Sequence, residues 1–272
     1  MTDRAYDCLR LDFADGVGEI TLDMPQYGNA LTVAGIQEFL DALRECGRRD
    51  DVGAVLLRGA GKSFCTGFNL KEIPLAEADI EDIAKHFEVA AMWWHQAMHK
   101  IVHIERPVLV AVHGAAAGVG LGIALCADMV ICRDDARFLC AWHTIGLAND
   151  ATTSYSLAKI VGFRRAQELM LTNRTLSGSE AVEWGIANQV YAAAAFDDAV
   201  RRIARDLAAG PTHLQALAKE SFHQGWRRSV EEATECEIQN VMKSVRHPYF
   251  REALNRFIAG DQKSDVEQVR LP

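Results

Sequence analysis

The sequence predicts an α/β fold, in which strands alternate with helices around a parallel sheet over the first two thirds of the chain. Short aliphatic and β-branched runs alternate with longer stretches that repeat apolar residues every three to four positions. One run, at 108–112, is apolar throughout, as expected of a strand buried on both faces. After about residue 190 the pattern is helical almost throughout, with breaks at Pro211 and Pro248.

The predicted elements follow in order from the N-terminus. In the first half they are a strand at 17–22, a helix at 32–48, a strand at 52–58, a glycine-rich loop at 59–68, a long helix at 79–104 and a strand after Pro107. In the second half they are a helix at 119–126, strands at 129–132 and 138–142, a helix from Asn149-Asp150 to Val161 and the helices after 190. We expect a core with the active site over residues 1–200. The helical region 201–272 must then pack on that core or on another subunit.

Composition excludes several classes of function. The 272 residues are 49% hydrophobic and 24% charged, which is ordinary for a globular protein. Net charge is 29 minus 37, or −8, and there is no basic block, so no nucleic-acid partner is expected. The apolar stretch 108–127 contains His113 and four glycines, which predicts a strand, a turn and a helix and no membrane partner. Seven cysteines without a CxxC pair, and a start without an apolar signal, predict a cytoplasmic location.

Two motifs resemble cofactor or metal sites without meeting their requirements. The segment 118–122 follows a strand and opens a helix, but its third glycine comes one residue early for a dinucleotide fingerprint. Its glycines instead permit close approach of another chain or ligand, and the helix start presents free amides to negative charge. His95, His99 and His103 share one helix face, but no HExxH motif accompanies them, so no metal is expected.

Two further patterns leave alternatives open. Asp150 precedes Ala-Thr-Thr-Ser at a predicted helix start, where a carboxylate can be an N-cap or an ionised nucleophile directed outward. Phe87 and Trp94 lie two helical turns apart, so they share one stripe that core packing alone could explain.

Segments spread along the chain carry a family resemblance. FCTGFNLK at 64–71 and GAAAGVGLG at 114–122 resemble the two signatures of the crotonase (enoyl-CoA hydratase/isomerase) superfamily, and the resemblance covers about residues 8–262. WWHQ at 93–96, CAWHTIG at 140–146 and the Asn-Asp pair before the helix resemble the 4-chlorobenzoyl-CoA dehalogenases within it. The resemblance implies a spiral of ββα turns with a helical C-terminal region for trimerisation, assembled as a homotrimer.

The resemblance also implies a reaction and its residues. It implies hydrolytic dehalogenation of an aryl-CoA thioester, with CoA as part of the substrate and no separate cofactor. By motif position, the backbone amides of Phe68 and Val119 form the oxyanion hole. Asp150 is the nucleophile, His95 the base that activates water, and Trp142 orients the carboxylate through its indole N–H.

The remaining assignments come with two departures from the family pattern. Phe87 and Trp94 are expected to wall the aryl pocket, and coenzyme A is expected to contact Thr66, Gly67 and Lys71. Val119 stands where the family usually has glycine, and Gly28 stands where a close relative has a basic residue.

The motif positions of the two hydratase glutamates hold Gly122 and Trp142, so hydration lacks its acid and base. An enoyl-CoA hydratase/isomerase reaction and a non-catalytic acyl-CoA-binding protein remain the alternatives.

Overall fold

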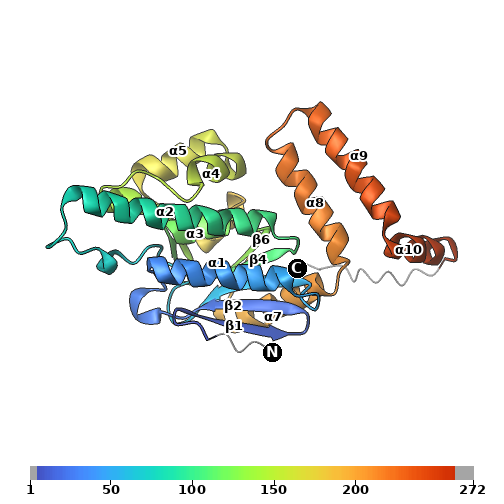
Figure 1. Cartoon of the computed structure of the whole chain (residues 1–272), viewed down its shortest axis with the longest axis horizontal. Helices are drawn as coiled ribbons and strands as arrows, with labels where there is room; N and C mark the ends of the chain where they lie inside the picture. The colour runs from blue at the N-terminus through green and yellow to red at the C-terminus, as the bar shows by residue number, and fades with distance from the viewer. Residues whose placement is uncertain (1–4, 261–272) are drawn as a thin grey trace.

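A six-stranded sheet forms the centre of the computed structural model, which describes residues 5–260 (Figure 1). The strands lie in the order β1 (Leu9–Ala14), β2 (Val17–Leu22), β3 (Ala54–Gly59), β4 (Val108–Val112), β6 (Met129–Arg133) and β9 (Gln189–Tyr191). Only β1 runs antiparallel to its neighbour, and the other pairs are parallel. The predicted parallel sheet is confirmed, whereas β1 and β9 were not predicted from the sequence.

Both faces of this sheet are covered by helices. In β3, Leu56 points toward the cluster formed with α7 (Ala193–Ala208), and its neighbour Leu57 belongs to the core on the opposite face. That opposite core includes residues of α1 (Val33–Arg48), α2 (Ile80–His103) and α3 (Val119–Cys126). Successive side chains of a strand point to opposite faces. Burial on both faces therefore explains why β4 is apolar at every position.

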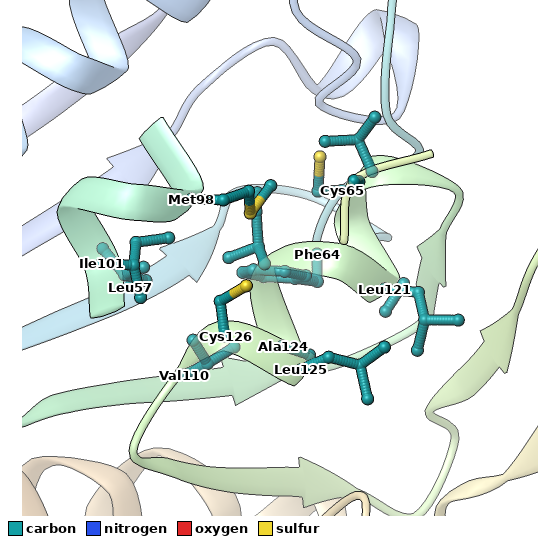
Figure 2. Packing of buried hydrophobic residues seen from close by; sticks show 14 of the residues in the cluster. Leu57, Phe64, Cys65, Met98, Ile101, Val110, Leu121, Ala124, Leu125 and Cys126 are labelled. Atoms are coloured by element: carbon teal, nitrogen blue, oxygen red, sulfur yellow. The ribbon is translucent and has the colours of Figure 1, made fainter. Parts of the chain in front are cut away.

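Residues of α2, α3 and the middle strands pack together in the core (Figure 2). Phe64, Met98 and Leu121 are fully buried there, and every residue of α3 is buried. A helix that is apolar on all sides belongs in the interior. The apolar stretch 108–127 is therefore β4, the short strand β5 (Ala115–Ala117) where the sequence predicts only a turn, and the buried helix α3. No helix among the described residues is long and apolar enough to cross a membrane.

A second sheet of three short strands lies beside the start of α3. It consists of β5 (Ala115–Ala117), β7 (Arg137–Leu139) and β8 (Thr175–Ser177). The predicted strand 138–142 is wrong beyond Leu139, because Ala141 takes a left-handed conformation (φ 66°) and a 3₁₀ turn, η3 (Trp142–Ile145), follows. The remaining short elements before α7 are η1 (Pro25–Tyr27), η2 (Leu70–Glu72), α4 (Thr153–Val161), α5 (Phe163–Thr172) and α6 (Gly178–Glu183).

Three helices extend from this body at the C-terminal end of the described chain (Figure 1). They are α8 (Thr212–Gly225), α9 (Val230–Arg246) and α10 (Pro248–Ile258), and the breaks at Pro211 and Pro248 fall where the sequence predicts them. Residue 200, the predicted boundary, lies inside α7, whose apolar face packs on the sheet. The part of the predicted C-terminal region after residue 260 lies outside the described residues.

Lys219 anchors α8 to the body. Its ammonium donates to Asp128 Oδ2 at 2.7 Å and to the carbonyl of Ile101 at 2.8 Å. Asp128 Oδ2 also accepts from the backbone N–H of Val108 at 2.7 Å. Because Lys219 is buried, the pair joins the C-terminal helices to α2 and β4 through a contact that water screens little.

Candidate active site

An imidazole and a carboxylate from distant parts of the chain meet at the surface of α2. His95 Nε2 lies 2.6 Å from Asp150 Oδ1, and both side chains are partly exposed. His95 is in the middle of α2, and Asp150 is in the loop before α4. A basic ring nitrogen thus touches a carboxylate that a ligand can reach.

The loop geometry shows whether the Asp150 side chain is an N-cap, an alternative that the sequence left open. The N-cap of α4 is Thr152, two residues later, and the Asp150 side chain does not cap the helix. Only its carbonyl is used there, accepting from the amide and the hydroxyl of Thr153. The N-cap interpretation is therefore wrong, and the carboxylate is left to face His95.

Backbone strain and close packing fix this loop. Ala151 and Thr152 both have positive φ, at 53° and 60°, which is costly for residues other than glycine. Ala151 is fully buried against α3, where a Cβ on Gly122 would lie 2.6 Å from the Ala151 Cβ. Gly122 therefore lets the loop of Asp150 sit directly on α3. A larger residue at position 122 would push the carboxylate away.

The predicted oxyanion amides lie at the other end of α3. Leu31 donates to the carbonyl of Gly67 and accepts from the amide of Asn69, so the amide of Phe68 between them points away from Leu31. Val119 is the first residue of α3, where the backbone N–H has no intrahelical acceptor. A Cβ on Gly67 would be 3.2 Å from the nitrogen of Val119, so the two segments are in contact.

A second glycine of α3 makes this approach possible. A Cβ on Gly120 would lie 2.0 Å from the carbonyl oxygen of Cys65, which no side chain could tolerate. Cys65 in turn pairs with Ala116 as an isolated bridge of parallel type. Gly120 and Gly122 thus bring two different segments against α3, one carrying Phe68 and the other Asp150.

The predicted aromatic residues separate into two environments. The rings of Phe68 and Phe87 lie 5.9 Å apart, and His86 lies 5.8 Å from Phe68. Trp94, in contrast, is 1% exposed and packs on Phe39 at 6.2 Å. Its indole Nε1 is buried without a hydrogen-bond partner among the described residues. The structure brings Phe87 to Phe68, and it places Trp94 behind them in the core.

Trp142 is held by a residue that the sequence does not single out. Asn173 accepts from the amide of Ala141 at 3.0 Å and donates to Thr144 Oγ1 at 2.7 Å, so it bridges both ends of the turn that carries Trp142. The indole itself makes no hydrogen bond to Asp150 within residues 5–260. Asn173 was missed because its left-handed conformation (φ 51°) and its long-range contacts leave no local pattern.

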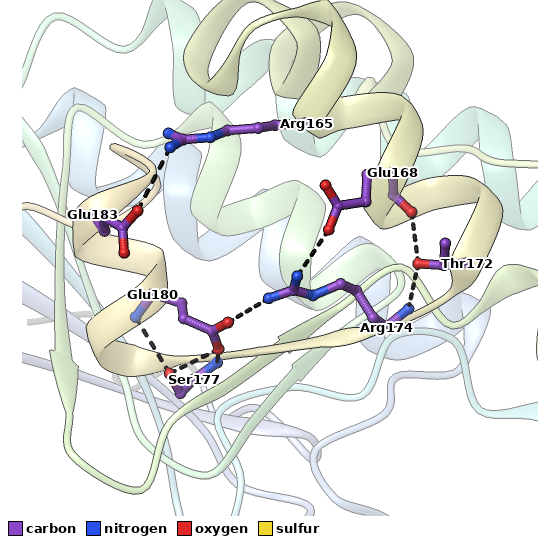
Figure 3. Close-up of polar contacts among 7 residues, drawn as sticks. All are labelled: Arg165, Glu168, Thr172, Arg174, Ser177, Glu180 and Glu183. Atoms are coloured by element: carbon purple, nitrogen blue, oxygen red, sulfur yellow. Dashed lines mark hydrogen bonds and ion pairs between the residues drawn. The ribbon is translucent and has the colours of Figure 1, made fainter.

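An ion-pair network fixes the segment around Asn173 (Figure 3). Arg174 contacts Glu168 of α5 at 2.8 Å and also pairs with Glu180 of α6. Glu180 and Ser177 form a reciprocal capping box at the start of α6. The network joins α5 to α6 and so supports the turn of Trp142 from behind.

Of the three predicted coenzyme A contacts, Thr66 and Lys71 are exposed and Gly67 is buried. The Thr66 hydroxyl is within hydrogen-bond distance of the carbonyls of Tyr27 and Gly28. Lys71 is exposed and lies 5.3 Å from the Tyr27 ring centre. Gly28 has φ 63°, and a Cβ there would be 3.0 Å from Thr66. The positive φ and the close contact with Thr66 both favour glycine at position 28, which is expected to be basic in a close relative.

A cavity of about 510 Å³, which we call the α8 cavity, opens beside His95 and Asp150. Its walls come from α2, α3, the start of α4 and the end of α8. They are formed by His95, Met98, His99, Val102, Leu125, Cys126, Asn149, Asp150, Thr152, Ser154, Tyr155, Ser156, His223, Trp226 and Arg227. Phe68, Phe87 and Val119 do not line it. The cavity therefore borders the His95–Asp150 pair and not the predicted oxyanion amides.

The histidines behind the reactive pair form no metal cluster. His99 and His103 lie 6.5 Å apart, and no group of three or more potential ligands is arranged to hold a metal ion among the described residues. Burial lowers the pKa of His223 to about 4, with a further lowering from Lys219. His223 is therefore neutral near pH 7.

Known proteins match both the sequence and the fold. The sequence model described as enoyl-CoA hydratase/isomerase matches residues 12–264. Two 4-chlorobenzoyl-CoA dehalogenases from an Arthrobacter species are 43% identical over 263 residues, covering 97% of this chain and 95% of theirs. The 1,2-epoxyphenylacetyl-CoA isomerase of Escherichia coli is 28% identical over 245 residues, covering 90% of this chain and 92% of its own.

Solved structures agree in fold. An enoyl-CoA hydratase from Mycobacterium smegmatis superposes with a TM-score of 0.85 at 28% identity, covering 94% of this chain and 97% of that one. An enoyl-CoA hydratase from Bacillus anthracis gives 0.86 at 26% identity, with 93% and 97% covered. Relatives of this group catalyse several reactions on one fold, so the fold alone does not assign the reaction. The chain belongs to the enoyl-CoA hydratase/isomerase family.

Proposed function

We propose that this chain hydrolyses the carbon–chlorine bond of 4-chlorobenzoyl-CoA, giving 4-hydroxybenzoyl-CoA and chloride. The observation that carries the proposal is the 2.6 Å contact between His95 and Asp150. Asp150 is also the one acidic side chain among the described residues that line the α8 cavity. Hydration by paired carboxylates has no second carboxylate there. The 43% identity to two dehalogenases supports the same reaction.

The spacing along α3 suits an aromatic thioester. Val119 and Gly122 are three residues apart, which is about 4.5 Å of helix. In the proposed complex the thioester oxygen lies at the amides of Phe68 and Val119, and the loop of Asp150 docks one turn away at Gly122. A benzoyl ring spans a similar length between its carbonyl carbon and its para carbon. The carboxylate would therefore meet the carbon that bears chlorine.

Attack on the ring requires stabilisation of the charge that it creates. When an Asp150 oxygen adds to the para carbon, the electron pair moves through the ring to the thioester oxygen. Two preorganised amides, that of Val119 at the start of α3 and that of Phe68, favour that charge, and one such donor is typically worth about 3–4 kcal/mol. Chloride then leaves with the electron pair of the carbon–chlorine bond. An aryl ester on Asp150 remains.

Hydrolysis of this ester falls to His95. Once Asp150 is esterified, its contact with His95 Nε2 is released, and the imidazole can take a proton from water. The hydroxide attacks the carboxyl carbon of Asp150, and the bond to the aryl oxygen breaks. The product keeps an oxygen from Asp150, and Asp150 gains one from water. A positioned base of this type contributes about 10²- to 10⁴-fold.

The other assigned residues position the substrate. Phe68 and Phe87 would face the ring, whereas Trp94 is buried against Phe39 and would not touch it. Trp142, held by Asn173, would donate its indole N–H to Asp150 in the substrate complex. Thr66, Gly67 and Lys71 would face the coenzyme A portion. No separate cofactor is required, because coenzyme A activates the ring as part of the substrate.

Chloride release decides between this reaction and an enoyl-CoA reaction. The purified protein is mixed with 4-chlorobenzoyl-CoA, and with crotonyl-CoA in parallel, and chloride and absorbance are followed. Chloride release with an inert crotonyl-CoA sample is expected. Turnover of crotonyl-CoA without chloride release would support a hydratase or isomerase. Tight binding of both thioesters without turnover would support an acyl-CoA-binding protein.

A further inference from the structure

The α8 cavity extends from the reactive pair in the direction opposite to the predicted ring pocket. Phe87 lies eight residues before His95 on α2, about 12 Å along the helix, and Val102 lies seven residues after it, about 10 Å. Phe87 contacts Phe68, whereas Val102 lines the cavity. A bound aryl thioester would fill the first space and leave the second open to small species.

The walls of the cavity are rich in hydrogen-bond donors. Hydroxyl groups come from Thr152, Ser154 and Tyr155, and imidazoles come from His99 and His223. Asp150 is the one carboxylate among the described lining residues, and it loses its charge when it forms an ester. The cavity is then a space of neutral donors with one permanent cation at its mouth.

That cation is the guanidinium of Arg227, at the turn after α8. The Arg227 guanidinium lies close to the hydroxyl of Tyr155, and Lys159 donates to the same hydroxyl at 2.9 Å. Lys159 also donates to the carbonyl of Trp226. These contacts fasten the end of α8 over the start of α4. They hold the cationic group at the wall of the cavity, where it is exposed.

We propose that the α8 cavity is a halide site, through which chloride leaves and water reaches the Asp150 ester, with Arg227 as its anion-binding residue. The inference rests on the proposed function. The charge balance fits it, because the negative charge of the Asp150 carboxylate moves to chloride when the ester forms. Chloride accepts hydrogen bonds from hydroxyl, imidazole and guanidinium groups, and it does not require these donors to lie in fixed directions. The thioester can stay bound while chloride and water exchange behind the ring.

Halide binding is measured without turnover, by the line width of the ³⁵Cl NMR signal at constant ionic strength, with and without added bromide. The wild-type protein is expected to broaden the chloride signal, and bromide is expected to reverse the broadening. In Arg227→Gln, bromide should bind about tenfold more weakly, the usual loss for a hydrogen bond to a charged group. Arg227→Lys should retain most of the affinity. Arg228→Gln, the neighbouring exposed arginine, should behave like wild type.

Each outcome separates this inference from the proposed function. Broadening that bromide does not reverse, or that is equal in wild type and Arg227→Gln, overturns the halide site even where chloride is released from 4-chlorobenzoyl-CoA. Broadening that depends on Arg227 supports the site. If that protein releases no chloride from the thioester, the anion site stands and the assigned reaction fails.

Discussion

At the scale of single residues, the central feature is a carboxylate that does not cap the helix it precedes. Asp150 precedes a helix, yet a strained pair of residues moves the cap to Thr152 and turns the side chain to His95. The sequence identified both residues through motif resemblance, while helical periodicity alone could not choose between cap and nucleophile. The sequence did not predict the role of Asn173, because that role depends on contacts across the fold.

His95→Gln should separate the two chemical steps. The variant keeps a polar side chain beside Asp150, so the first attack should proceed and release about one chloride per active site. Hydrolysis of the ester should then slow by about 10²- to 10⁴-fold, because no base activates water. Rapid-quench measurement of chloride, with mass spectrometry of the protein, should show the aryl ester accumulating on Asp150. Steady turnover at the wild-type rate, without accumulation, would remove His95 from the role of base.

At the scale of elements, α3 joins the two halves of the site. Gly120 and Gly122 allow the segments of Phe68 and Asp150 to approach it, and its first turn supplies the amide of Val119. The sequence predicted α3 with its observed bounds because its apolar run and its flanking glycines are local signals. Which segments would approach those glycines depends on tertiary packing, and only the family resemblance indicated them.

The attachment of α8 should depend on its buried ion pair. Removing one partner of a buried pair typically costs about 3–5 kcal/mol, because the other charge stays buried. Lys219→Met should therefore lower the free energy of unfolding by about that much in urea, at fixed protein concentration. Lys243→Met, which breaks an exposed pair with Glu220 at 3.2 Å, should cost less than about 1 kcal/mol. Equal losses in the two variants would show that the Asp128–Lys219 pair does not anchor α8.

The same region should make the protein sensitive to acid. The folded-state pKa of His223 is about 4 because of burial, below the ordinary 6.5. Between those values the unfolded chain binds more protons than the folded one, so stability falls as the pH falls from 6.5 to 4. His223→Gln should lose less melting temperature between pH 7 and pH 5 than wild type does. The remaining loss would come from other histidines with lowered pKa, His103, His113 and His213. Parallel curves for the two proteins would exclude His223 as a source of the acid sensitivity.

At the scale of the whole molecule, the C-terminal helices carry apolar side chains that the described chain does not cover. Phe222 of α8, Val230 of α9 and Phe257 of α10 are all more than two thirds exposed, at 78%, 71% and 82%. The sequence predicted helical structure here with breaks at Pro211 and Pro248, because proline and helical periodicity are local signals, but it did not predict the break between α8 and α9. It could not show where they pack, because that depends on contacts with the rest of the assembly.

We expect these faces to be covered in a homotrimer. Sedimentation equilibrium should then give three times the chain mass of 30.0 kDa. Phe257→Glu should shift the distribution toward smaller species, because a charge would be buried in the interface. A monomer at micromolar concentration, or a variant that sediments like wild type, would contradict a trimer built on α10.

The proposed reaction requires a covalent bond between Asp150 and the ring, and oxygen labelling detects whether that bond forms. Excess enzyme is mixed with 4-chlorobenzoyl-CoA in H₂¹⁸O for a single turnover, with Asp150→Asn as the control that should release no chloride. We expect ¹⁶O in the phenolic position of the first product and ¹⁸O in the peptide that contains Asp150. If the first product carried ¹⁸O and the peptide stayed unlabelled, water would have attacked the ring directly, and Asp150 would not be the nucleophile.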